Sequence, residues 1–247
     1  MSTETPLAAP EPTAAPKTPA SPLIPRLHAG DRLTRDEFLR RYFAMPDVNH
    51  AELIEGVVYM PSPVSASNHG EPHFDLLTWL GTYRAYTPKV RGGDNSTLML
   101  DIDNCPQPDG YLRLLPEHGG QSKVVDGYIE GAPELVAEVA ASSVSYDLHD
   151  KLNAYRRNGV KEYVVWQVWD REVVWFQLHK GQFEKQPLPD DGIFRSQSFP
   201  GLWLDAKAVV DGNLPRVLEV LQQGIASPEH RDFVAQTSET PPTQPAE

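Results

Sequence analysis

Apolar positions along the chain follow two different periods, and each period predicts a different kind of element. One set recurs at helical spacing and predicts a helix over residues 66–86; it consists of His69, His73, Leu76, Leu77, Leu80 and Tyr83. Residues 135–140 instead form a short continuous apolar run, which is typical of a central buried strand. A second helix is expected over residues 146–157, because Asn158-Gly159 is a good helix-ending signal.

The remaining segments complete an alternating order of helices and strands. Thr34 and Glu37 fit a capping box at the start of a short helix. A hairpin with Gly56 as its bend is expected over residues 52–60. The other expected extended segments are 98–102, 109–115, 163–169 and 173–178, then one near Phe183, with a last helix over 214–222. This order, without an internal repeat, predicts an α/β domain whose central mixed β-sheet is flanked by helices.

The two ends of the chain differ from the middle in composition. Residues 1–30 are rich in Pro, Ala and Thr, and residues 225–247 are polar and acidic. Such segments bury too little apolar surface to offset the entropy of ordering, so we expect disordered tails around a single folded domain over residues 31–224.

Charge and cysteine content narrow the possible functions. The chain has a net charge of -12, and about -9 remains after the ends, which contribute zero and -3, are removed. A nucleic-acid-binding domain is usually basic on its binding face, so this balance argues against strong non-specific DNA binding. The lone Cys105 excludes an intramolecular disulfide framework and a cysteine-built zinc site.

The same sequence contains no membrane or export signal. No apolar run approaches the roughly 20 residues of a membrane span, and the N-terminus lacks a basic-then-apolar signal pattern. A cytoplasmic location is therefore expected. Trp166, Trp169 and Trp175 fall in the expected strand hairpin, where packing is their simplest role.

Glu138 is the most unusual position, because it places a carboxylate inside the apolar run 135–140. On a period of two it shares a face with Val136 and Ala140. A buried carboxylate is costly unless it is paired or binds a cation. A functional site and a buried ion pair are equally compatible with this position.

Two further residues could complete a site around that carboxylate. Asp109 follows Pro108 at the start of an extended segment, where it could share a hard cation such as Mg²⁺ with Glu138, although Pro-Asp-Gly is also a common turn. Lys151 could point back toward the strand end, or it could form an ordinary exposed pair with Asp147 four residues earlier.

Other candidates are less distinctive. Of Glu52 and Glu55 at most one can face inward on a strand, and Glu52 is the better candidate. His69 and His73 lie four residues apart, but no third ligand has a clear spacing, so an amphipathic boundary explains them better than a metal. His69 remains a possible donor to a substrate.

Taken together, these segments resemble the Uma-type family of restriction endonucleases, in the PD-(D/E)XK nuclease superfamily, over about residues 31–210. The segments that carry the resemblance are 52–56, 60–63, His69, Pro108-Asp109, 131–139, Asp147 with Lys151 and Tyr155, and 159–163. The segment after Glu138 reads Ala141-Ser142-Ser143-Val144 and lacks the family's usual proline.

The resemblance implies a restriction-endonuclease-like core and a set of roles. Asp109 and Glu138 would be catalytic acids that bind Mg²⁺ or Mn²⁺, and Glu52 would be a further acid of the site. The superfamily's lysine position holds Ala140, so Lys151 on the following helix would replace it. Tyr155 and His69 would contact the substrate.

Two functions follow as expectations. The first is a Mg²⁺-dependent endonuclease that hydrolyses DNA, with a homodimer implied only by the resemblance. The second is a nuclease fold kept as a non-catalytic module that binds a protein partner, which the acidic charge would suit.

Overall fold

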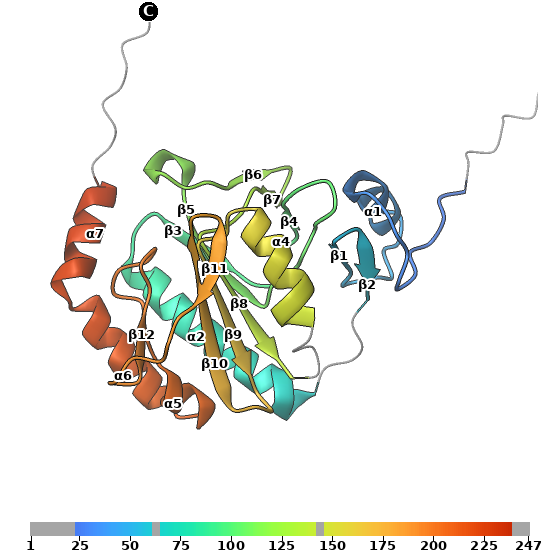
Figure 1. Ribbon diagram of the computed structural model, residues 1–247. Helices are drawn as coiled ribbons and strands as arrows, with labels where there is room; N and C mark the ends of the chain where they lie inside the picture. The colour runs from blue at the N-terminus through green and yellow to red at the C-terminus, as the bar shows by residue number, and fades with distance from the viewer. Residues whose placement is uncertain (1–22, 61–64, 142–145, 239–247) are drawn as a thin grey trace, which may run out of the picture.

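A six-stranded mixed sheet forms the centre of the computed structural model, which describes residues 23–60, 65–141 and 146–238 (Figure 1). The strand order is β11-β10-β9-β8-β5-β3. These strands span Gln182–Lys185, Glu172–His179, Glu162–Gln167, Leu135–Ala140, Gly110–Leu114 and Val90–Gly93. The pair β8–β9 is parallel and the other neighbours are antiparallel. The expected α/β class with a central mixed sheet is confirmed.

Helices cover both faces of this sheet. On one face lie α2, α5 and α6, which span Glu71–Tyr86, Ala206–Val210 and Leu214–Ile225. On the other face lies α4, Leu152–Arg157, with the small sheet β4-β7-β6 beside it, of Leu98–Met99, Tyr128–Glu130 and Lys123–Val125 (Figure 1). Strand β8 is therefore buried along its whole length, as its continuous apolar run predicts.

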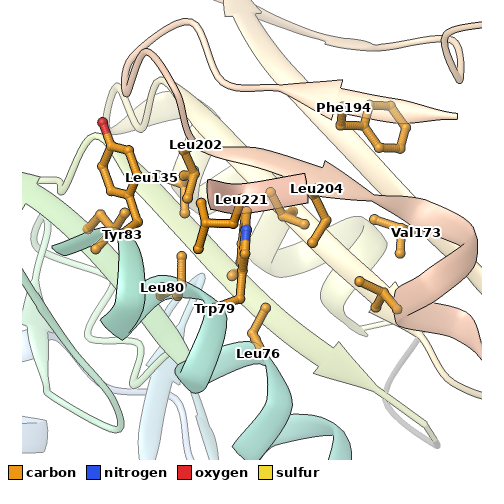
Figure 2. Close-up of a cluster of buried hydrophobic side chains, with 14 of the residues drawn as sticks. Leu76, Trp79, Leu80, Tyr83, Leu135, Val173, Phe194, Leu202, Leu204 and Leu221 are labelled. Atoms are coloured by element: carbon orange, nitrogen blue, oxygen red, sulfur yellow. The ribbon is translucent and has the colours of Figure 1, made fainter. Parts of the chain in front are cut away.

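The larger core lies between the sheet and α2. Leu76, Trp79, Leu80 and Tyr83 of α2 face Leu135 and the C-terminal segments around Leu202, as Figure 2 shows. Gly110 permits the close approach of helix and sheet, because a Cβ there would lie 2.8 Å from a methyl carbon of Leu80. This contact fixes the position of the residue before it, Asp109.

Smaller units surround the central layers. The N-terminal unit contains α1, Arg35–Tyr42, and the hairpin of β1 and β2, Glu52–Ile54 and Val57–Tyr59, around the buried Phe38. A hairpin of β12 and β13, Ile193–Arg195 and Trp203–Asp205, leads into α5, and a short 3-10 turn, η2, covers Pro116–His118. Helix α7, Pro228–Ser238, follows α6.

Both long helical segments expected from the sequence begin with a wide turn of π type. Segment η1, Ala66–Gly70, leads into α2, and η3, Asp147–Lys151, leads into α4. The helix ends at Asn158-Gly159 as predicted, because Gly159 adopts a φ of 82° that favours glycine. Single π turns inside helices are frequent at functional sites.

Two local predictions are wrong. Thr34 does precede α1, but its side chain makes no capping hydrogen bond, and the Glu37 carboxylate pairs with Arg40 and Arg41. Trp166 and Trp175 are buried strand residues as expected, whereas Trp169 is 62% exposed because it lies at the turn between β9 and β10.

The predicted tails also need correction. Residues 225–238 are ordered, because α7 packs through the buried His230 and Ser227. Leu27 is buried against the N-terminal unit, so order begins before residue 31. Residues 1–22 and 239–247 lie outside the described residues. Within the described part of the chain, no helix is both long and apolar enough to cross a membrane.

Candidate functional site

Asp109 and Glu138 hold each other's strands at the end of β8 by two reciprocal hydrogen bonds. The backbone N–H of Asp109 donates to Glu138 Oε2 at 3.2 Å, and the backbone N–H of Val139 donates to Asp109 Oδ2 at 2.8 Å. The antiparallel register, with Gly110 opposite Ala137, brings the two positions together. Two buried carboxylates from neighbouring strands therefore lie side by side.

Lys151 reaches back from its helix to the strand. The alternative of an ordinary exposed ion pair with Asp147 is therefore wrong, because Lys151 is buried and has closer partners. Its Nζ donates to Glu138 Oε1 at 2.9 Å and lies 3.1 Å from Glu52 Oε1. Asp147 is the more distant partner, at 3.7 Å. Lys151 is only 5% exposed, because the wide turn η3 directs it inward.

Glu52, and not Glu55, is the acid that faces this cluster. Glu52 is buried, and its Oε1 also accepts the backbone N–H of Gln107 at 2.7 Å. Glu55 lies in the β1–β2 turn with a φ of 50° and pairs with Arg157 on the surface. The hairpin thus brings a third acid to the site from the start of the domain.

Two tyrosines enclose the charged cluster. Tyr155 is fully buried and donates its hydroxyl to Glu138 Oε1 at 3.0 Å, so it contacts the carboxylate directly, and its expected contact with substrate stays a prediction. Tyr146 lies with its ring centre 5.3 Å from Lys151 Nζ and its hydroxyl 3.5 Å from Glu52 Oε2. Tyr146 was not predicted as part of the site, because a tyrosine fits an apolar core as well as a polar site.

The electrostatics of this cluster are dominated by burial and by an excess of acids. Burial raises the pKa of Glu138 well above its ordinary value; Lys151 opposes the shift, and Asp109, Asp147 and Glu52 add to it. For Lys151, burial alone would lower the pKa, but Glu138, Glu52 and Asp147 outweigh it and raise the pKa well above the usual range. The ammonium is therefore held charged among carboxylates.

His69 and His73 both contact Asp109, a neighbour that spacing along the helix could not reveal. His69 Nε2 lies 3.2 Å from Asp109 Oδ1, and His73 Nε2 donates to the Asp109 carbonyl oxygen at 2.7 Å. The hydrogen bond with Asp109 raises the pKa of His69. Burial would raise the pKa of Asp109, but His69 lowers it below its ordinary value.

The donor set suits a hard divalent cation. Glu138 and Asp109 are adjacent carboxylates, and among the described residues each oxygen of Asp109 has one partner, although a carboxylate oxygen can accept two. Oxygen ligands of this kind suit Mg²⁺ and Mn²⁺. Residues 61–63 and 142–144, which also entered the family resemblance, lie outside the described residues.

Comparisons with known proteins identify the family of the chain and its fold. Residues 35–207 match the Uma2 family model, described as "Putative restriction endonuclease". A solved structure from Anabaena variabilis ATCC 29413, described as "a putative nuclease belonging to DUF820", matches with a TM-score of 0.54 at 14% identity. The match covers 70% of this chain and 98% of that chain, and it shows a shared fold. No curated protein matches. Because the family model covers more than half of the sequence, the chain belongs to the Uma2 family of nuclease-like proteins.

Proposed function

We propose that the chain is a divalent-metal-dependent endonuclease that hydrolyses phosphodiester bonds of DNA. The observation that carries this proposal is the reciprocal pairing of Asp109 and Glu138 with Lys151 beside them. Membership of the Uma2 family and the nuclease-like fold support it.

In this proposal Asp109 and Glu138 hold Mg²⁺ or Mn²⁺ through their carboxylate oxygens. When bound, the ion would supply Lewis-acid polarisation of a phosphate oxygen. Lys151 places a fixed positive charge within 2.9 Å of Glu138, where it can stabilise negative charge that develops on a phosphate. His69 is only half-buried beside Asp109, so it can donate a hydrogen bond to the substrate.

Glu52 and Tyr155 act as positioning residues. Glu52 anchors Lys151 from the hairpin side at 3.1 Å, and Tyr155 holds Glu138 Oε1 from the helix side at 3.0 Å. Both are buried, which keeps the acids and the lysine in one geometry before substrate arrives. An arrangement fixed in advance is what electrostatic stabilisation of a transition state requires.

The test is plasmid and oligonucleotide cleavage by the purified chain with Mg²⁺ or Mn²⁺. We expect metal-dependent nicking or linearisation that EDTA abolishes. Asp109→Asn and Glu138→Gln should each reduce the rate by at least about two orders of magnitude, since each removes a charged ligand of the proposed metal ion. Glu184→Gln removes the same charge from the exposed β11 strand and should cleave like the unmodified chain.

Cleavage that persists in Asp109→Asn with Glu138→Gln would assign the activity to another site or to a contaminant. If no DNA is cut with any of the metal ions, calorimetry with Mn²⁺ distinguishes a metal-binding site from a non-catalytic module. Failure to bind Mn²⁺ would favour a non-catalytic module that binds a protein partner.

A further inference from the structure

Two imidazoles and one carboxylate meet beside the Asp109–Glu138 pair. One donor atom each of His69, His73 and Asp109 can be chosen so that all three lie within 4.8 Å of one another. His69 comes from η1 and His73 from the first turn of α2, and Asp109 comes from the residue before β5. The cluster is thus built by three separate parts of the fold and not by one exposed loop.

We propose that His69, His73 and Asp109 form a second cation site, selective for a borderline divalent metal such as Co²⁺ or Zn²⁺. Imidazole nitrogen suits these ions, whereas Mg²⁺ prefers oxygen ligands. Three protein ligands also leave coordination positions open, as in catalytic metal sites. This site goes beyond the proposed nuclease function, because binding there does not require that DNA be cut.

The surroundings of the two histidines favour this assignment. A carbonyl oxygen can only accept, so the 2.7 Å contact with the Asp109 carbonyl places a hydrogen on His73 Nε2 and leaves the other ring nitrogen of the neutral form unprotonated. A backbone carbonyl that orients an imidazole in this way is a common partner of metal-binding histidines. The His69 side chain is 23% exposed and that of Asp109 is 12% exposed, so an ion can reach the cluster.

A simple ion pair between His69 and Asp109 explains less of the arrangement. Such a pair needs one imidazole, yet the ring centres of His69 and His73 lie 5.5 Å apart, with both rings in contact with the same aspartate. Asp109 is common to this cluster and to the Glu138 pair, so the two sites are neighbours. The chain therefore offers one oxygen-rich and one nitrogen-containing site that meet at a single carboxylate.

Titration of the metal-free chain with CoCl₂ tests the proposal, followed by calorimetry and by the visible absorption of Co²⁺. We expect one site whose affinity falls at least about tenfold in His69→Gln and in His73→Gln, because each loses a direct ligand. His179→Gln removes an exposed histidine at the end of β10 and should bind Co²⁺ unchanged. Circular dichroism of each variant checks that it is folded.

Glu138→Gln separates this site from the proposed nuclease centre. It should keep its Co²⁺ affinity while it loses Mg²⁺-supported cleavage. The proposal is overturned if both histidine variants bind Co²⁺ as the unmodified chain does, or if Glu138→Gln loses Co²⁺ as completely as they do. Absence of cleavage with intact Co²⁺ binding would remove the proposed nuclease function and leave this site standing.

Discussion

At the scale of single residues, one ammonium group compensates several buried carboxylates. Lys151 lies within 4 Å of Glu52, Glu138 and Asp147, and all four side chains are at most 7% exposed. Burying a charge is expensive, and removal of one partner from a buried pair leaves the other without compensation. Such a cluster costs stability to assemble, and the proposed binding of a metal ion by Glu138 would account for its presence.

Lys151→Met should lower the free energy of unfolding by about 3–5 kcal/mol, because it leaves the three carboxylates without their cation. Adding Glu138→Gln to Lys151→Met should recover part of this loss, since one carboxylate no longer needs a counter-charge. Chemical denaturation of the single and double variants measures both effects. If the two losses simply add, the charges of Lys151 and Glu138 are not coupled.

An exposed lysine provides the matched comparison. Lys185 pairs with Glu172 at 2.9 Å, but both side chains are about half exposed. Exposed pairs contribute little to stability, so Lys185→Met should leave the unfolding transition almost unchanged. A comparable loss in both lysine variants would mean that burial of Lys151 is not the cause.

The residues of the site differ in how much the sequence revealed. Glu138 could be identified because a charge interrupts an apolar run. For Lys151 the sequence left two alternatives open, one directed toward the strand and one paired with Asp147 on the surface. His73 was assigned to an amphipathic boundary, because its partner Asp109 lies 36 residues away and only the fold brings them together. Spacing along one helix shows which side chains share a face, and it does not show what lies opposite.

At the scale of elements, α6 depends on a close approach to the loop before β13. Gly224 lies in α6, and a Cβ there would come within 2.3 Å of the carbonyl oxygen of Gly201 and 2.8 Å of Trp203 Cγ. The backbone atoms of the loop cannot move aside as a flexible side chain could. The helix and the loop can pack this closely only because neither glycine has a side chain.

Gly224→Ala should therefore destabilise the chain by about 1–3 kcal/mol through overpacking, although alanine is the better helix former. Gly81→Ala is the matched control, because Gly81 lies in α2 with open space around its Cβ direction. That control should stabilise by about 0.5–1 kcal/mol. Thermal unfolding of both variants should show shifts of opposite sign, and a gain in both would contradict the close approach.

Helix α7 illustrates why the end of the fold was missed from sequence. Its residues are mostly polar, so their composition resembles a disordered tail. The helix is held by His230, whose Nε2 lies 2.9 Å from Thr87 Oγ1 and whose ring packs edge-on against Tyr83. These partners lie about 140 residues earlier in the chain, and composition carries no information about them.

Acid should weaken this end of the molecule. Burial lowers the pKa of His230 below its ordinary value of 6.5, so the unfolded chain takes up a proton before the folded chain does. The stability that depends on neutral His230 is therefore complete above pH 6.5 and is lost as the pH falls through the folded pKa. In His230→Gln the unfolding free energy should fall less between about pH 8 and about pH 5.

Denaturation curves of the unmodified chain and of His230→Gln over this range measure the difference. His179→Gln, which removes an exposed histidine, should keep the pH dependence of the unmodified chain. Equal slopes in the unmodified chain and in His230→Gln would show that α7 docks without a contribution from this proton.

At the scale of the whole molecule, the proposed reaction on DNA has to occur on an acidic chain. The net charge is -12, and many exposed cations are already paired with carboxylates. These pairs include Arg26–Asp47, Arg40–Glu37, Arg157–Glu55, Lys185–Glu172, Arg195–Asp191, Lys207–Asp211 and Arg216–Glu219. Exposed cations outside these pairs include Arg84, Arg91 and Lys180. In the proposed function, a cation held by Asp109 and Glu138 would add to whatever attraction such side chains exert on DNA phosphates.

This charge balance predicts an unusual salt dependence. A protein that neutralises six to ten phosphates loses about 10³–10⁵ in affinity between about 50 mM and 200 mM salt. If DNA is held mainly through the proposed metal, by about two phosphate contacts, the same change should weaken binding by roughly tenfold or less. Fluorescence anisotropy with a duplex, at constant Ca²⁺ to prevent cleavage, measures the slope. A steep slope would mean that phosphates are bound by a basic surface and not through the metal at the acidic site.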